Sequence, residues 1–190
     1  MTAQATAQKA AQIVNGVNVT ALFDTIAAIK AEPSLAQFNF RAKNRWQTGE
    51  KNCTTIGAFS GANQEHRKDT EPFTAWNGEP AVLLGEDKAP NPVEWLLHAL
   101  IGCMTTTLAY HAASRQIVIE SIESSIDGDL DLRGFLGLSD KVRNGYNKIR
   151  VTMRVKSAAS PTALKELAKL SPVFDVVSKS VPVDVTVATV

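Results

Sequence analysis

The sequence predicts an α+β fold in which antiparallel sheets pack around one long central helix. Residues 91–115 form a long apolar segment that opens with helix-start signals. Residues 146–156 alternate apolar and charged side chains, which is typical of a strand with one buried and one solvated face. The expected strands come in runs and not in strict alternation with helices, and no repeat or linker divides the chain. We therefore expect a single domain over residues 1–190.

The overall composition excludes several classes of protein. A net charge of +1, from 20 basic and 19 acidic residues, provides no electrostatic reason to expect binding to nucleic acid or to a membrane. The first residues lack the hydrophobic segment of a signal peptide and only two cysteines are present, so we expect a cytoplasmic protein with reduced thiols. The potential metal ligands do not cluster at ligand spacing, so neither a metal nor another cofactor is expected; they are His66, His98, His111, Cys53 and Cys103.

The N-terminal part is expected to hold one helix followed by a hairpin. Asn18 or Thr20 can start the helix, and Pro33 bounds it. The apolar spacing then changes to two, which predicts a strand with Phe38, Phe40, Ala42 and Trp46 on one side and Asn39, Arg41, Lys43 and Arg45 on the other. A turn near Gly49 leads to the partner strand, Cys53 to Phe59.

The segment before the central helix is expected to be mostly loops and turns. Residues 60–71 are polar and contain a glycine, so they are expected to form a loop. Two short strands, Phe73–Trp76 and Ala81–Leu84, flank Asn77-Gly78, which is a strong signal for a tight hairpin turn. Residues 85–90 form a second polar connection.

The central helix has the clearest start in the chain. Asn91 can cap it, Pro92 suits the first helical position, and Glu94 stands where the acid of a capping box reaches back. Apolar residues wrap most of the way around the helix, so we expect it to be buried on nearly all sides. Polar side chains interrupt it too often for a membrane span.

Two strands and two helices are expected after the central helix. Alternation near residues 122–132 and from Tyr146 to Lys156 predicts strands joined by a loop over residues 133–145. Ser160-Pro161 opens a helix through Leu170, and Ser171-Pro172 opens a shorter one through about Val177. The tail, Val181 to Val187, alternates once more.

Several of these motifs occur together in one protein family. They are the Asn-Pro opening of the central helix, the small-residue approach Ala99-Leu100-Ile101-Gly102 to Cys103, the threonine-rich turn that follows, the Ser171-Pro172-Val173 step and the closing strand of valines. With them the sequence resembles the OsmC/Ohr family of thiol-dependent hydroperoxide reductases over roughly residues 36–190. The N-terminal helical segment, about residues 1–35, is similar to an extension found in one OsmC-like branch.

The resemblance implies an intertwined homodimer in which sheets from both chains enclose two central helices, with the active sites at the interface. It also implies that Cys103 attacks the O–O bond of a peroxide. A second cysteine then captures the sulfenic acid, and an arginine and a glutamate position the thiolate. Oxidative-stress defence is the role implied.

Three positions depart from the family pattern. The second cysteine precedes the Pro-Val of the late helix in the family, and this chain has Ser171 there. The family glutamate directly follows the Asn-Pro, where this chain has Val93, with Glu94 one step later. The arginine lies in the first strand or its following turn, where Arg45 and a Lys51 replacement are alternatives.

Cys103 is either a reactive thiol or one that fills space in the interior. Free cysteines are often simply buried, and a nucleophilic cysteine must be ionised by a nearby cation, helix N-terminus or other donor. Cys103 stands 12 residues after Asn91, beyond the first turn where the helix dipole acts. Its activation must therefore come from another segment or another subunit.

Neighbours on the same helix offer few partners to this thiol. Glu94 lies about half a turn away and about 13 Å along the axis, so capping is its expected role. Thr106 and Thr107 share the face of Cys103, where their hydroxyls can donate to a thiolate or bond back to a carbonyl one turn earlier. Arg45 is either a solvated residue or, in a dimer, the cation beside a neighbour's sulfur.

Two functions are compatible with these residues. The first is a one-cysteine peroxidase acting on organic hydroperoxides, with Cys103 as nucleophile, Arg45 and Glu94 as its partners and an external thiol as reductant. The second is a non-peroxidatic relative that binds an apolar small molecule at the dimer interface, where Cys103 is part of the wall.

Overall fold

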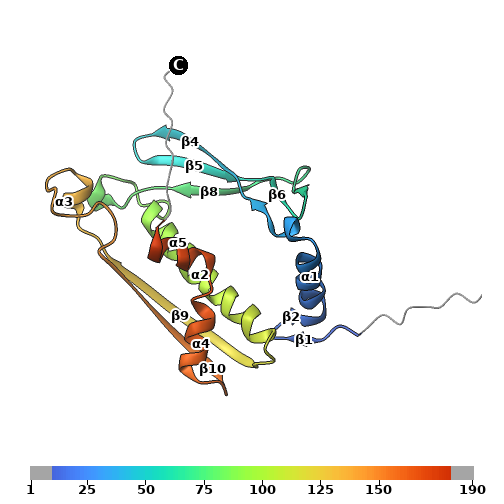
Figure 1. Cartoon of the computed structure of the whole chain (residues 1–190). Helices are drawn as coiled ribbons and strands as arrows, with labels where there is room; N and C mark the ends of the chain where they lie inside the picture. Colours follow the sequence, from blue (N-terminus) through green and yellow to red (C-terminus); the bar gives the residue numbers. More distant parts are fainter. Residues whose placement is uncertain (1–9, 181–190) are drawn as a thin grey trace, which may run out of the picture. The chain divides into compact units, whose positions relative to one another are not determined.

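The computed structural model describes residues 10–180, which combine helices with small antiparallel sheets (Figure 1). The predicted α+β class is confirmed. Contacts divide these residues into two compact units. The N-terminal unit comprises residues 10–13 and 18–96, and the C-terminal unit comprises residues 14–17 and 97–180. None of the helices in the described part of the chain combines the length and the hydropathy needed to cross a bilayer.

Helix α1, Val19–Ala31, begins where the sequence predicts. Asn18 is its N-cap, and the Asn18 side-chain oxygen accepts the N–H of Ala21 at 3.0 Å. The helix ends just before Pro33, which starts the short 3-10 helix η1, Pro33–Ala36. A hairpin that was not expected precedes α1, formed by β1 (Ile13–Val14) and β2 (Val17–Asn18). Asn15 and Gly16 both have positive φ, which is the two-residue turn that Asn-Gly favours.

The main sheet of the N-terminal unit has the order β4-β5-β8, with antiparallel pairs. Its strands are β4 (Ala42–Thr48), β5 (Lys51–Ile56) and β8 (Phe73–Asn77). A smaller antiparallel sheet has the order β3-β6-β7 and contains Phe38–Asn39, Phe59–Gly61 and Gln64–His66. The predicted hairpin around Gly49 is therefore confirmed, although the segment from 38 to 59 contributes to two sheets.

Three predictions for the segment before the central helix are wrong. Residues 60–71 are not one loop, because Ala62 and Asn63 adopt the positive φ angles of a tight turn and join β6 to β7. Asn77-Gly78 does not close a hairpin, because β8 pairs back onto β5 and the Gly78 N–H donates to the carbonyl of Pro90 at 3.3 Å. Residues Ala81–Leu83, expected in a strand, form the 3-10 helix η2.

The C-terminal unit contains most of the long helix α2, Pro92–Ala113. An antiparallel hairpin of β9 (Ile119–Asp129) and β10 (Lys148–Ser157) follows, and then α4 (Pro161–Ala168) and α5 (Pro172–Lys179). These elements confirm the predicted positions. The connection over residues 133–145 begins with a short helix that was not expected, α3 (Leu132–Phe135). The strand predicted for Val181 to Val187 lies outside the described residues.

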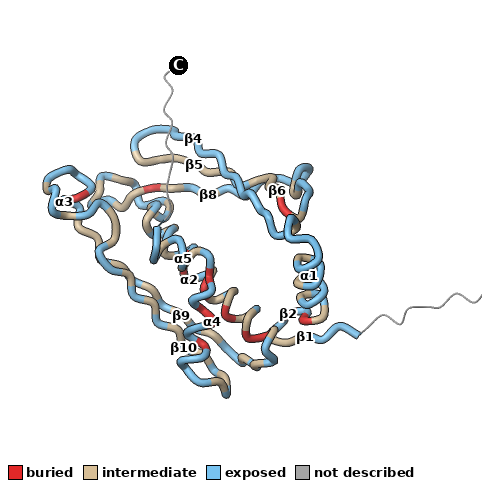
Figure 2. The backbone as a smooth tube through the Cα atoms, in the orientation of Figure 1, coloured by how far each residue is buried: buried red, intermediate tan, exposed pale blue. Residues whose placement is uncertain are grey.

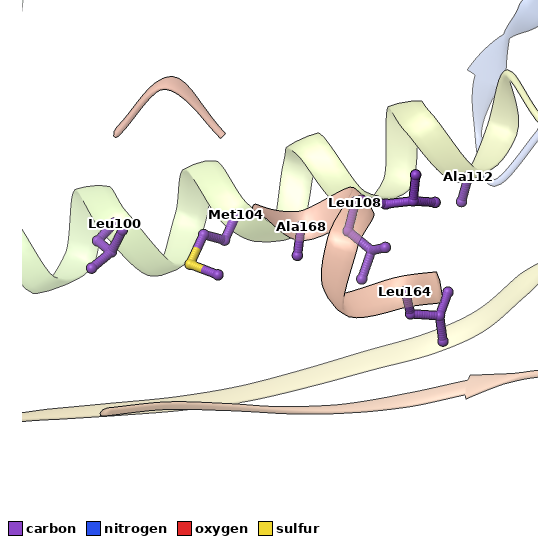
Figure 3. Packing of buried hydrophobic residues seen from close by; sticks show 7 residues of the cluster. Leu100, Met104, Leu108, Ala112, Leu164 and Ala168 are labelled. Atoms are coloured by element: carbon purple, nitrogen blue, oxygen red, sulfur yellow. The ribbon is translucent and has the colours of Figure 1, made fainter. Parts of the chain in front are cut away.

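The core of the C-terminal unit is a stripe along α2. Its members recur every four residues and therefore share one face of the helix; they are Leu100, Met104, Leu108 and Ala112. Figure 3 shows this stripe beside Leu164 and Ala168 of α4. The apolar face of the β9–β10 hairpin packs against the same cluster through Ile122, Ile126, Ile149, Val151, Met153 and Val155.

The expectation that α2 is buried on nearly all sides is wrong for a single chain. The helix buries the stripe described above, whereas Leu96 and Tyr110 are exposed. The strand β4 likewise has a predicted apolar side, but all seven of its residues are exposed and Trp46 is 67% accessible (Figure 2). Apolar alternation identifies a face that can be buried, and the described residues of the N-terminal unit leave this face of β4 uncovered.

Candidate functional site

Cys103 lies on α2 at the edge of the buried stripe. It follows Leu100 by three residues, which places it about 60° around the helix from that core residue. The next residue, Met104, belongs to the core itself. Cys103 is half-buried and its thiol is free. Cys103 is therefore not a member of the buried cluster of this unit.

The three threonines after Cys103 differ in their hydrogen bonds. The Thr105 hydroxyl lies 3.4 Å from the Ser124 hydroxyl of β9 and so connects the helix to the hairpin. The hydroxyls of Thr106 and Thr107 make no hydrogen bond within residues 10–180. The alternative in which one of them bonds back to a carbonyl a turn earlier is therefore not realised.

Glu94 and Asn91 form the predicted capping box. The Asn91 side-chain oxygen accepts the N–H of Glu94 at 2.9 Å, and the Glu94 carboxylate accepts the N–H of Asn91 at 2.8 Å. This reciprocal pair satisfies two backbone donors that a helix start leaves open. Glu94 thus has a structural role at the start of α2, about half a turn around the helix from Cys103.

The two alternatives for the family arginine have different surroundings. Lys51 forms an ion pair with Glu86, and hydrogen bonds from Lys51 and then Lys88 lower the pKa of Glu86 to about 2. Arg45 on β4 is exposed, and its guanidinium forms no ion pair or hydrogen bond within residues 10–180. Of the two cations, Arg45 is therefore the one whose charge is available to another partner.

The register of the main sheet brings Cys53 next to Arg45. Residues paired across antiparallel strands project from the same face, and β4 pairs Arg45 with Cys53 while β8 pairs Trp76 with Cys53. Cys53 is half-buried and its thiol is free. The alignment of Arg45, Cys53 and Trp76 was not predictable from the sequence, because side-chain alternation does not determine the register between strands.

Ser171, at the position of the family's second cysteine, is fully buried. It is the N-cap of α5, and its hydroxyl accepts the N–H of Phe174 at 3.1 Å. Since the whole chain has only two cysteines, Cys53 and Cys103, no thiol stands at the start of this helix. Position 171 thus serves the structure of α5.

Two of the histidines make local contacts. The His66 ring lies 2.9 Å from the carbonyl of Gly61, and the His111 ring lies 3.2 Å from the guanidinium of Arg115. Burial, and then the neighbouring Arg115 charge, lowers the pKa of His111. Within residues 10–180 no three His, Cys, Asp or Glu side chains are grouped so that they can hold a metal ion.

A groove of about 730 Å³ opens beside the core of the C-terminal unit. Its walls come from four elements and are mainly apolar, with Met104, Leu108, Val151, Met153, Leu164 and Phe174 among the lining residues. Two lysines of α4, Lys165 and Lys169, also line it. Cys103 is not one of its lining residues, so the groove and the thiol are separate features of this unit.

Solved structures share the fold of the chain at low identity. An OsmC-like protein from Mycoplasma pneumoniae is 16% identical, with a TM-score of 0.53 over 74% of this chain and 88% of the other. A protein from Psychrobacter arcticus 273-4, to which an osmotic-stress and detoxification response has been ascribed, is 15% identical, with a TM-score of 0.52 over 73% and 88%. An OsmC-like protein of unknown function from Vibrio cholerae is 14% identical, with a TM-score of 0.51 over 72% and 92%.

The sequence was also compared with protein-family models and with curated proteins. No curated protein matches the chain. The family model described as OsmC-like protein matches residues 85–186, which is more than half of the chain and includes α2 with Cys103 and the start of α5 with Ser171. The chain belongs to the OsmC-like family.

Proposed function

We propose that this OsmC-like protein is a thiol-dependent hydroperoxide reductase with Cys103 as its nucleophile. The observation that carries the proposal is the place of Cys103, a half-buried free thiol beside the buried stripe on the central helix. Partial exposure suits a nucleophilic cysteine, because the thiolate must meet its substrate and a nearby donor must stabilise its charge. Organic hydroperoxides are the proposed substrates and oxidative-stress defence the proposed role.

The proposed reaction begins with attack of the Cys103 thiolate on the terminal oxygen of the hydroperoxide, ROOH. A sulfur–oxygen bond forms as the O–O bond breaks, and the alkoxide leaves and takes up a proton to become the alcohol, ROH. The peroxide gains two electrons and the sulfur loses two, so Cys103 becomes a sulfenic acid. No metal or other cofactor takes part in this step.

The second half of the cycle needs a thiol from outside the chain, because position 171 is a buried serine. An external thiol attacks the sulfenic sulfur, water leaves and a mixed disulfide forms. A second external thiol then releases the Cys103 thiol and leaves as a disulfide. Without this reductant the sulfenic acid is open to irreversible oxidation. The proposal places the protein in the cytoplasm, where reducing thiols are maintained.

We assign the cation that stabilises the thiolate to Arg45 of a second copy. The Arg45 guanidinium has no intrachain partner in the described residues, which supports this assignment. The alternative cation, Lys51, is already paired with Glu86. Glu94 can join the site only from the partner, since on its own helix it lies about half a turn from Cys103. In this proposal the two units are parts of one OsmC-like domain, with about residues 1–35 as its extension.

The uncovered apolar faces support a homodimer. Trp46, Phe40 and Phe38 are each at least half exposed in the single chain. Exposed aromatic residues such as these, on β3, on β4 and between the two strands, are typical of interfaces, because a partner surface removes their area from water. The proposed partner is a second copy of this chain.

The test is to mix the reduced protein with an equimolar amount of cumene hydroperoxide and to follow peroxide loss and intact mass. We expect peroxide to disappear much faster than with free cysteine, and one oxygen atom to be added at Cys103. Adding a small thiol should then restore the original mass. Matched Cys103→Ser and Cys53→Ser variants identify the reacting sulfur. Peroxide loss in Cys103→Ser as fast as in the unchanged protein would exclude the proposed nucleophile.

A second candidate function is favoured by the groove beside the core. Its volume of about 730 Å³ and its mainly apolar walls suit an apolar small molecule. In this alternative the protein is a non-peroxidatic binding protein with its ligand at the dimer interface, and Cys103 has a packing role. Solvent extraction of the purified protein followed by mass spectrometry tests this alternative. A stoichiometric apolar ligand together with a slow thiol supports it, whereas an empty protein with a fast thiol excludes it.

A further inference from the structure

The guanidinium of Arg67 lies over two phenyl rings of the N-terminal unit. Its central carbon is 4.7 Å from the centre of the Phe59 ring and 5.5 Å from the centre of the Phe73 ring. Both distances are within the range of cation–π contacts. Phe59 begins β6 and Phe73 begins β8, so strands of two sheets hold the rings that the guanidinium contacts. The half-buried Arg67 side chain is therefore positioned by these ring contacts.

The same guanidinium makes no hydrogen bond and no ion pair within the described residues. Its Nε is buried and has no hydrogen-bond partner. The two Nη atoms also lack partners in this part of the chain but, unlike Nε, are not buried. An arginine has five N–H donors, and donors that are withdrawn from water normally find an acceptor. The outer edge of the guanidinium, formed by the two Nη atoms, is open to a partner.

The carboxylates nearest in the sequence do not pair with Arg67. Glu65 forms an ion pair with Arg41, and Asp69 and Glu71 form none among the described residues. Arg67 also has a φ of 55°, a left-handed conformation that residues with a Cβ seldom adopt. A strained backbone and a buried, unpaired donor both raise the free energy of the fold, and such features are concentrated at functional positions.

The surroundings of Arg67 favour a carboxylate that is attached to an apolar group. Two parallel N–H groups match the two oxygens of a carboxylate, and a guanidinium already held on rings loses little freedom when it binds one. The Phe73 side chain is 65% exposed, so apolar surface is available next to the charge. Residues 65–71 contain three acids and two bases, which disfavours a ligand of higher negative charge.

We propose that Arg67 is the anion-binding residue of a small-molecule site, which takes a monocarboxylate with an aromatic or other apolar body. The two Nη groups donate hydrogen bonds to the carboxylate oxygens, and the apolar body lies against the exposed ring of Phe73. No bond of the ligand is made or broken. The site uses residues of the N-terminal unit and does not depend on the proposed role of Cys103.

The test is a nitrogen-15 NMR titration of the full chain with sodium benzoate at pH 7 and constant ionic strength. The backbone amide signals of residues 59–73 are followed. Benzamide keeps the ring and lacks the charge, whereas inorganic phosphate keeps a negative charge and lacks the ring. Arg67→Lys keeps the positive charge and removes the planar fork, and Phe73→Leu removes the exposed ring. Arg154→Lys is the matched control, because Arg154 is exposed and has no partner or ring contact within residues 10–180.

We expect benzoate to cause saturable shifts at Phe59, Arg67 and Phe73. Arg67→Lys should weaken binding on the order of tenfold, which is the size expected for the loss of hydrogen bonds to a charged group. Benzamide and phosphate should bind more weakly than benzoate by a similar factor, Phe73→Leu should have a smaller effect, and Arg154→Lys none. The absence of saturable shifts, equal binding of benzamide or phosphate, or an Arg67→Lys titration like that of the unchanged protein would each overturn the proposed site.

A carboxylate of a second copy is the other partner that this guanidinium can take, and sedimentation equilibrium separates the two. We expect self-association to be the same with and without benzoate, and the same in Arg67→Lys. Self-association that Arg67→Lys weakens and benzoate inhibits would place Arg67 in an interface between copies and overturn the small-molecule site. Cys103→Ser should bind benzoate like the unchanged protein, so failure of the peroxidase proposal leaves this test unaffected.

Discussion

The hairpin β9–β10 and the strand β4 have the same kind of sequence pattern and different surroundings. β10 alternates polar and apolar residues along most of its length, and β4 has Ala42 and Trp46 on the side opposite Lys43 and Arg45. On β10 the apolar side chains, among them Val151 and Met153, are half-buried and pack against the stripe of α2. Strand β4 is exposed along its whole length (Figure 2). Trp46 on this strand is 67% accessible. The pattern predicts strands in both regions, but in the described residues a cover from the strand's own unit is present only for the hairpin.

The difference shows where the C-terminal unit is self-sufficient and where the N-terminal unit is not. Two or three strands become stable when one face packs on a helix or another sheet. The stripe of α2 provides that surface for the hairpin. The sheet β4-β5-β8 has exposed aromatic residues and no comparable buried cluster in the described residues. The proposed homodimer provides the missing cover, and mutations can test this difference between the units.

The largest expected effect on stability comes from a substitution in the buried stripe of α2. Leu108 is 1% exposed, so Leu108→Ala should leave a cavity and lower the free energy of unfolding of the C-terminal unit by about 3–5 kcal/mol. Urea denaturation followed by circular dichroism measures the loss. Val82→Ala is the control, because Val82 is 86% exposed and its truncation should change little. A similar small loss from both variants would contradict the core described here.

The next prediction concerns self-association through the exposed strand β4. If a second copy covers β4, Trp46→Ala should weaken self-association by about 2 kcal/mol, the scale of a buried aromatic anchor, whereas Trp46→Phe should retain most of the affinity. Sedimentation equilibrium over a range of concentrations measures the dissociation constant. A chain that is monomeric at every concentration, or a Trp46→Ala variant with unchanged affinity, would show that β4 is not the interface.

A smaller effect on stability is expected from two N-cap serines, which accept the same kind of backbone hydrogen bond but differ in burial. Ser171→Ala removes a fully buried hydroxyl that accepts the Phe174 N–H, and about 1–2 kcal/mol of stability should be lost. Ser160→Ala removes the exposed cap of α4, which accepts the Ala163 N–H at 3.3 Å, and should cost less. Chemical denaturation of both variants measures the difference. Equal losses would mean that burial of position 171 adds nothing to its cap.

These comparisons also show which features the sequence could predict. The capping box of Asn91 and Glu94 depends on residues three apart, so the local sequence was enough to predict it. The hairpin turn at Asn77-Gly78 was predicted wrongly, because β8 pairs with β5 and not with the residues that follow the turn. The pairing of Arg45 with Cys53 depends on strand register, which the alternation of side chains does not determine.

The sequence likewise predicted only part of the candidate site. The place of Cys103 on a long helix follows from local signals and from the family resemblance. The Thr107 hydroxyl has no hydrogen-bond partner within residues 10–180, and this was not predictable because a helical threonine usually bonds to its own backbone. The cap role of Ser171 was predictable, but its complete burial depends on packing in three dimensions.

The smallest expected effect concerns exposed ion pairs, which both units have. Hydrogen bonds from Lys51 and Lys88 lower the pKa of Glu86 from 4.5 to about 2 in the N-terminal unit, and Arg133 lowers the pKa of Asp131 to about 2 in the C-terminal unit. A carboxyl with a depressed pKa stabilises the fold above its unfolded pKa, and this contribution is lost as the pH falls through its folded pKa. The contribution of Glu86 should therefore disappear between about pH 4.5 and about pH 2.

Glu86→Gln and Asp131→Asn should each flatten the acid side of the stability profile slightly, and added salt should reduce both effects because the pairs are exposed. Urea denaturation from pH 6 to pH 2.5 at low and high salt measures this. Since both units have such pairs, they cannot be the reason why one unit has a core and the other does not. A loss from Glu86→Gln larger than that from Ser171→Ala would contradict this reasoning, because surface charge would then hold the N-terminal unit together and its sheet would need no cover.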